Sequence, residues 1–90
     1  MEWGDLKTVL EIERLSFPNP WPVSAFMGEI DNHPISFPFV IVHKRSDKVI
    51  GYIIIWHINE EAQISNFAVH PDFKRLGIGK AVIQGVLKQF

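Results

Sequence analysis

The sequence predicts an α+β fold, in which a three-stranded antiparallel meander is preceded by two helices and followed by a third. Apolar residues recur at helical spacing over residues 5–16 and 79–90. Apolar, β-branched stretches fill the middle of the chain, and the connections between them are short enough for hairpins. The 90 residues are 47% hydrophobic and 21% charged, which is typical of a globular chain. Residues 1–90 are therefore expected to form a single domain.

The first helix is expected over residues 5–16. Asp5 is a plausible N-cap, and Leu6, Val9, Leu10 and Glu13 follow it at helical spacing. Three prolines then exclude a helix over residues 17–22, because each proline lacks an N–H and restricts the residue before it. This segment is expected to be a stiff loop.

A short second helix is expected to begin at Ser24, which can act as its cap, and to end by Asn32. Phe26, Met27 and Ile30 would form its buried face, and Glu29 would point outward.

Three strands are expected in the middle of the chain, over residues 37–43, 49–58 and 62–69. The polar turns at 44–48 and 59–61 are short, so neighbouring strands should pair antiparallel. The third strand is read as apolar at alternate positions. The final helix, over residues 79–90, would pack back across this sheet.

Two glycines, Gly77 and Gly79, lie where the third strand gives way to the last helix. Glycine lets a backbone approach a ligand closely and adopt positive φ, and the free N–H groups of a helix start favour an anion. Lys74, Arg75 and Lys80 add positive charge at the same end. The stretch over residues 70–80 is thus predicted to bind phosphate, although two glycines alone are more often a simple connecting turn.

Two common nucleotide motifs do not fit this spacing. A Walker-type loop would require Gly at position 74 and Ser or Thr at position 81, where the chain has Lys74 and Ala81. A dinucleotide fingerprint that began at Gly77 would require a small residue at position 82, which is Val82.

The run over residues 66–79, Asn-Phe-Ala-Val-His-Pro-Asp-Phe-Lys-Arg-Leu-Gly-Ile-Gly, instead resembles the acetyl-coenzyme A site of the GNAT (Gcn5-related) N-acetyltransferases. Residues 12–21, Ile-Glu-Arg-Leu-Ser-Phe-Pro-Asn-Pro-Trp, are similar to the branch that acetylates protein N-termini, typified by enzymes acting on ribosomal-protein alanine. The resemblance implies a three-layer GNAT-like fold, of which these residues would be the central part. Whether the chain is a fragment or a naturally short relative stays open at this point.

The resemblance also implies a cofactor site for acetyl-coenzyme A. The pantetheine arm would pair with the third strand, the thioester carbonyl would face an N–H near Phe67 or Ala68, and the pyrophosphate would sit over the start of the last helix. The family often has Gln or Arg where Lys74 stands and Arg where Leu76 stands, so the loop is less charged here. The implied cofactor-binding residues are Phe67, Ala68, Val69, Lys74, Arg75, Leu76, Gly77, Ile78, Gly79 and Lys80.

The resemblance implies further that Phe17 and Trp21, in the proline-rich loop, wall the first residues of a peptide acceptor. The alternative is that both aromatic side chains only cover the core. The family's catalytic Glu and Tyr correspond to positions beyond Phe90, so no catalytic residue is assigned. Glu61 is either a solvated charge at a turn or an assisting base.

Several classes of ligand and location are not expected. The net charge of −1 gives no support for nucleic-acid binding, and the four histidines lack metal-ligand spacing. The chain has no cysteine, its longest uncharged apolar run covers only residues 49–58, and its first residues are no signal peptide. A cytoplasmic protein without metal or membrane partner is expected. An exposed third strand further predicts a homodimer.

The leading functional hypothesis is therefore an acyltransferase that moves acetyl from acetyl-coenzyme A to an amine, namely the N-terminal α-amine of a protein such as a ribosomal protein. The alternatives are a domain that binds coenzyme A or a partner protein without turnover, and a folded segment that binds neither.

Overall fold

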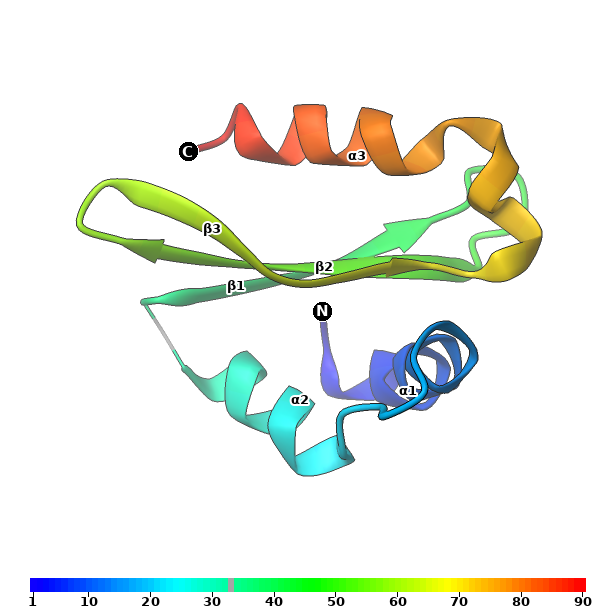
Figure 1. Cartoon of the computed structure of the whole chain (residues 1–90), viewed down its shortest axis with the longest axis horizontal. Coiled ribbons are helices and arrows are strands. Elements are labelled where there is room, and N and C mark those ends of the chain that lie inside the picture. The colour runs from blue at the N-terminus through cyan, green and yellow to red at the C-terminus, as the bar shows by residue number, and fades with distance from the viewer. Residues whose placement is uncertain (33) are drawn as a thin grey trace.

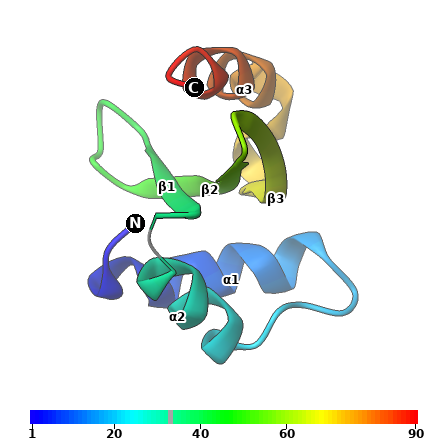
Figure 2. The same cartoon turned by 90° about the vertical axis from the view of Figure 1, so that its left-hand side faces the viewer.

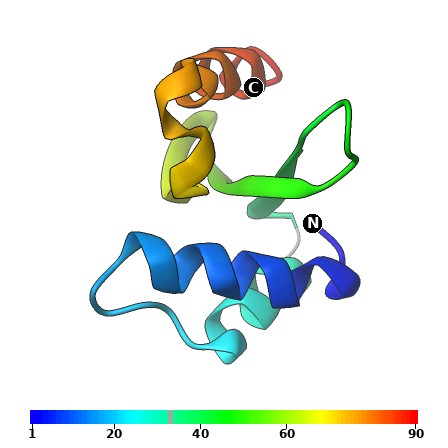
Figure 3. The same cartoon turned by 90° about the vertical axis from the view of Figure 1, so that its right-hand side faces the viewer.

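The computed structural model describes residues 1–32 and 34–90, with the backbone alone described at 75 and 76. The elements form three layers (Figure 1). Helices α1 (Leu6–Ser16) and α2 (Val23–Asp31) lie against one face of the sheet, and α3 (Ile78–Leu87) lies across the other. The two end-on views show the same sandwich of helix, sheet and helices (Figures 2 and 3). The predicted α+β class with three layers is confirmed.

The sheet is a meander in the order β1-β2-β3, with β1 at Ser36–Val42, β2 at Val49–Ile58 and β3 at Glu61–Val69. Both strand pairs are antiparallel, as the short turns predicted. The β2–β3 turn has positive φ at Asn59 (50°) and Glu60 (68°), the backbone that matches the twist of a two-residue hairpin. Within the described residues, β3 pairs only with β2 and therefore forms one edge of the sheet.

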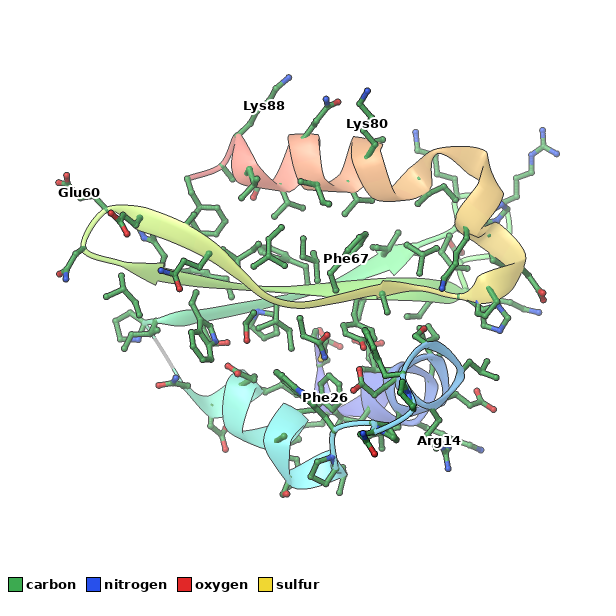
Figure 4. All side chains as sticks on the ribbon, in the orientation of Figure 1. Arg14, Phe26, Glu60, Phe67, Lys80 and Lys88 are labelled. Atoms are coloured by element: carbon green, nitrogen blue, oxygen red, sulfur yellow. The ribbon has the colours of Figure 1, made fainter. Side chains whose placement is uncertain are left out.

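The strand register divides the side chains between the two faces. Val40, Tyr52 and Ala68 stand opposite one another and belong to the core under α1 and α2. Their neighbours Ile53 and Phe67 are paired with each other and point toward α3, where Figure 4 shows Phe67 between the sheet and the helix. The sheet is thus buried on both faces, which explains the continuous apolar run of β2.

A bulge at Ser65 interrupts β3. Ile54 pairs with Asn66 and Ile55 pairs with Ile64, so Ser65 has no opposite residue on β2. The regular alternation predicted for this strand is therefore wrong, because one extra residue reverses which face the side chains before it occupy. The bulge places Ile64 and Phe67, three positions apart, on the same face.

Asp5 is the N-cap residue of α1, as predicted, but its side chain makes no capping hydrogen bond to that helix; the predicted cap at Ser24 is wrong. The chain turns earlier than expected, in a 3-10 helix at Trp3–Asp5, and the Asp5 side chain accepts a hydrogen bond from the Glu2 N–H (2.8 Å) in a capping box.

At α2 the N-cap is Pro22, whose extended backbone starts the helix without a side-chain hydrogen bond, and Ser24 lies inside the first turn. The predicted buried face of α2 is wrong at two positions, because Met27 is exposed and Glu29 is buried, where it accepts hydrogen bonds from the Trp56 indole N–H.

The ends of two other elements also differ from the prediction. β1 ends at Val42 rather than His43, because His43 exchanges backbone hydrogen bonds with Lys48 and Asp47 in the turn. α3 begins at Ile78 and ends at Leu87, after which Gln89 and Phe90 bond three residues back in a tighter turn. Among the described residues, no helix has the length and apolar character needed to cross a membrane.

Candidate functional site

A cavity of about 360 Å³ opens between β3, the start of α3 and the end of α1. This volume is within the range of small-molecule sites. The cavity brings together segments that are far apart in the sequence, since the end of α1 meets β3 and the turn that follows it. Its lining residues are Ser16, Phe17, Phe67, Ala68, Val69, Lys74 and Gly79.

The edge of β3 supplies backbone groups to this cavity. The His70 N–H donates to the Ile50 carbonyl on β2 (2.7 Å). Because N–H groups alternate in direction along an antiparallel strand, Ala68 also faces β2, whereas Phe67 and Val69 face the free edge. The Phe67 N–H accordingly donates to the Asn66 side-chain Oδ1 (2.9 Å) rather than into the sheet. Of the backbone donors predicted from the sequence, Ala68 is therefore used by the sheet, and Phe67 and Val69 are directed outward.

A 3-10 helix, η2 (Pro71–Leu76), follows β3 and leads into α3. The His70 side chain caps it by accepting a hydrogen bond from the Asp72 N–H (3.1 Å). Gly77 then adopts a left-handed conformation, with φ of 69°, which glycine takes without steric cost. The first N–H groups of α3 lack partners within the helix, and Gly79 in its first turn lines the cavity together with Lys74.

The predicted cofactor-binding residues divide into three groups. Phe67, Ala68, Val69, Lys74 and Gly79 line the cavity. Gly77 and Ile78 form the turn and the first residue of α3. The Lys80 side chain points away from the sheet (Figure 4), and the side chains of Arg75 and Leu76 lie outside the described part of the structure.

Gly79 packs its α-carbon against β3. A Cβ at this position would come within 3.3 Å of Cζ and 3.6 Å of Cε2 of the Phe67 ring. The sequence predicts that this glycine allows close approach of a ligand, whereas the structure directs its Cβ position toward an aromatic side chain that lines the cavity. Glycine here allows the close approach of α3 to β3.

A second hollow, of about 220 Å³, adjoins the first and shares Phe17 with it. The proline-rich loop supplies most of its wall, and Trp21 is also held against Phe26, with ring centroids 5.3 Å apart. Both predicted aromatic residues thus contact a hollow, and Trp21 contacts the core as well. The lining residues are Glu13, Phe17, Pro18, Asn19, Trp21 and Asn66.

A buried carboxylate stands at the base of this second hollow. Glu13 is only 1% exposed, and its oxygens accept hydrogen bonds from three donors. The Tyr52 hydroxyl and the Asn66 side-chain amide (3.0 Å) donate to Oε1, and the Trp21 backbone N–H (2.7 Å) donates to Oε2. These bonds tie α1 to the loop, to β2 and to β3.

This carboxylate changes the acidity of its neighbour. Burial is the largest cause that raises the pKa of Tyr52 well above its ordinary value, and the hydrogen bond to Glu13 and the charge of Glu13 raise it further. The Asn66 hydrogen bond acts in the opposite direction. Tyr52 is therefore a neutral donor throughout the physiological range.

The remaining candidates lie elsewhere. Glu60 lies at the tip of the β2–β3 hairpin, at the end of the sheet opposite η2 (Figure 4). Glu61 follows it as the first residue of β3 and lines neither hollow. His57 packs against Phe37 and Phe90, and His43 contacts Phe73. His33 lies outside the described residues. Across residues 1–32 and 34–90, no group of acidic or histidine side chains is arranged to hold a metal ion.

The model of the GNAT acetyltransferase family matches residues 6–90, which is nearly the whole chain. The chain belongs to the GNAT acetyltransferase family. The matched range includes β3, η2, α3 and every residue that lines the two hollows.

Relatives within the family include ribosomal protein bS18-alanine N-acetyltransferase of Escherichia coli K12, which is 25% identical over 89 residues. A Bacillus subtilis (strain 168) protein provisionally given the same name is 30% identical over 88 residues. These matches cover 99% and 98% of this chain, and 57% of each relative. The crystal structure of the Escherichia coli ribosomal-protein-S18-alanine N-acetyltransferase has the same fold, with a TM-score of 0.84 at 24% identity, and the match covers 99% of this chain and 55% of that one. The chain spans a little over half the length of these GNAT relatives.

Three residues of the site, Glu13, Ser16 and Asn66, were not predicted from the sequence. Glu13 was placed on the same helical face as Val9, and a charged residue on an apolar face is a signal of a buried polar partner. Its two side-chain partners, Tyr52 and Asn66, are 39 and 53 positions away, however, so the sequence did not reveal them.

Proposed function

We propose that this protein is an N-acetyltransferase that moves the acetyl group of acetyl-coenzyme A to the N-terminal α-amine of a protein. The observation that carries the proposal is the outward edge of β3, where the Phe67 and Val69 N–H groups face a cavity that ends at the start of α3. Such an edge can pair with the amide groups of a pantetheine arm as it would with an added strand.

The residues of the cavity fit acetyl-coenzyme A. Ser16 Oγ is buried and has no hydrogen-bond partner among the described residues, so it is available to a pantetheine amide. The first turn of α3 offers N–H groups and a positive dipole end to the pyrophosphate, and Lys74 adds a charge beside it. The close approach of Gly79 to Phe67 keeps α3 near the strand that would hold the arm.

In the proposed reaction a neutral amine attacks the thioester carbonyl. A C–N bond forms and the C–S bond breaks. The amine loses one proton, and the sulfur of coenzyme A takes up one proton and leaves as the thiol. An N-terminal amine has a pKa near 8, so a useful fraction is neutral at physiological pH. The Phe67 N–H would stabilise the oxyanion that develops on the carbonyl oxygen.

The acceptor would enter the second hollow, which meets the coenzyme cavity at Phe17. Pro18 follows Phe17, and Pro20 and Pro22 flank Trp21, so the loop is restricted and little order has to be gained on binding. The relatives are named as alanine N-acetyltransferases of ribosomal protein bS18, which supports a ribosomal-protein N-terminus as acceptor and a cytoplasmic location.

Two measurements test the proposal. Calorimetry with acetyl-coenzyme A should give saturable binding to one site. A thiol-release assay should then detect coenzyme A in the presence of a peptide with N-terminal alanine, but not with the same peptide acetylated at its N-terminus. Release that does not depend on a free amine, or absence of binding, would contradict the proposal.

A second candidate, a domain that binds coenzyme A without turnover, is favoured by one observation. Among the described residues that line the two hollows, Glu13 is the sole carboxylate, and three protein donors already occupy its oxygens. Saturable binding without thiol release from any amine would establish this second function.

A further inference from the structure

We propose that Glu13 is a positioning residue that couples the acceptor hollow to the coenzyme cavity. The first cavity is here called the coenzyme cavity and the second hollow the acceptor hollow, and these names rest on the proposed function. The hydrogen bonds from which the coupling is inferred do not depend on that function. Glu13 joins two routes: one oxygen holds the backbone of the loop at Trp21, and the other holds the side-chain amide of Asn66.

The second route continues to the edge of β3. Asn66 donates through Nδ2 to Glu13 Oε1 (3.0 Å), and its Oδ1 accepts from the Phe67 N–H (2.9 Å). One planar amide therefore connects the buried carboxylate with the outward N–H that faces the coenzyme cavity. An unbroken series of hydrogen bonds runs from the Trp21 N–H, through Glu13 and Asn66, to the Phe67 N–H.

This series has a consequence for ligand binding. A thioester carbonyl that accepts from the Phe67 N–H must share that donor with Asn66 Oδ1 or displace it. Because the amide of Asn66 is planar, rotation of its oxygen also moves the Nδ2 that bonds to Glu13. A ligand in the coenzyme cavity would therefore change the hydrogen bonds of Glu13, whose other oxygen holds Trp21 in the wall of the acceptor hollow.

The competing explanation is that Glu13 only stabilises the fold. Glu29 provides a matched control for this explanation. It is also a buried carboxylate, 8% exposed, on the same side of the sheet, and it accepts hydrogen bonds from the Trp56 indole N–H (3.0 and 3.2 Å). Glu29 lines neither hollow and is not hydrogen-bonded to Trp21 or Asn66, so its loss would loosen the fold without breaking the series.

The test measures amide hydrogen exchange by NMR in the 90-residue chain without ligand. Glu13→Gln keeps the side-chain shape but replaces one acceptor oxygen with a donor. Exchange of both the Trp21 and the Phe67 amides should become about tenfold faster. The Trp21 amide loses its charge-assisted bond to Glu13, and the Phe67 amide is bonded to the Asn66 side chain, which Glu13 no longer orders. Glu29→Gln should leave both amides unchanged. Faster exchange at Trp21 alone, or equal changes in the two variants, would overturn the proposal.

A second variant covers the case in which Glu13→Gln does not fold. Asn66→Ala breaks the series from the other side, and it should alter the Trp21 amide although Asn66 is not hydrogen-bonded to that amide. An unchanged Trp21 amide in this variant would be contrary to the coupling.

Addition of acetyl-coenzyme A separates this inference from the proposed function. In the parent protein the coenzyme should shift the Trp21 amide resonance, and this shift should be lost in Glu13→Gln but kept in Glu29→Gln. Failure of the parent to bind acetyl-coenzyme A would contradict the proposed function, while the exchange measurements without ligand would still decide the coupling. Binding that shifts Phe67 but leaves Trp21 unchanged in the parent would contradict the coupling alone.

Discussion

Replacement of Gly79 by valine should weaken coenzyme binding far more than the same change at Gly85, on the same helix. A Cβ at position 79 would lie 3.3 Å from the Phe67 ring, whereas a Cβ at position 85 would meet nothing within 4 Å. Valine adds two methyl groups beyond that Cβ, and such overpacking costs about 1–3 kcal/mol. Because Phe67 lines the cavity, the ring must move toward the ligand or the helix must move away from the strand.

If this cost opposes binding, the affinity for acetyl-coenzyme A should fall roughly 5- to 150-fold in Gly79→Val. Gly85→Val should bind like the parent, because valine costs a helix no more than glycine does. Calorimetry gives both affinities, and circular dichroism during heating checks that each variant folds. Parent-like binding by Gly79→Val would refute the assignment of the cavity, as would an equal loss in both variants.

Four further predictions concern charge, packing, acidity and association. Lys74→Ala should weaken coenzyme binding more at low salt than at high salt, because salt screens an exposed charge, whereas the loss in Gly79→Val should be independent of salt. Equal salt dependence of binding in the two variants would contradict the assignment of a charge effect to Lys74 and a packing effect to Gly79. Gly51→Ala should lower the free energy of unfolding in urea by about 1–3 kcal/mol, since its Cβ would lie 2.7 Å from the Ala68 carbonyl oxygen; an unchanged midpoint would be inconsistent with this contact. Tyr52 is the one tyrosine of the chain, and its raised pKa means that the folded state keeps a proton that the unfolded state loses above about pH 10. Stability should therefore be retained below that pH and decline above it, and Tyr52→Phe should lack this part of the decline; phenolate absorbance that rises near pH 10 before unfolding would argue against it. The exposed edge of β3 predicts a homodimer by light scattering at micromolar concentration, and a single species near 10.4 kDa at all concentrations would disprove it.

The sheet could be predicted from the sequence because its signals are local. β-branched and aromatic residues mark the strands, and the turn at Asn59 and Glu60 is short enough to fix an antiparallel pair. The bulge at Ser65 could not be predicted, because it depends on which residues of β2 stand opposite β3. The hydrogen bond of Asp5 could not be predicted for a related reason: from the N-cap position of α1 its side chain could bond to that helix or to the Glu2 N–H, and the sequence pattern does not choose between these.

The site was accessible to sequence reasoning in the same uneven way. The turn through Gly77 and the edge of β3 are contiguous in the chain, so their residues could be named together. Glu13 reaches the site only because α1 packs across β2 and β3, which brings Tyr52 and Asn66 to one carboxylate. Such a cluster depends on tertiary packing and has no sequence spacing of its own.

The most direct test of the proposed site is an NMR titration of the amide resonances with coenzyme A, which requires no turnover. The proposed site predicts saturable shifts that are largest at Phe67 and Val69 on the outward edge of β3, and at Gly77 and Gly79 where α3 begins. Amides of β1, on the opposite edge of the sheet, should stay unchanged. Shifts that gather on β1, or no saturable shift at millimolar coenzyme A, would contradict the site.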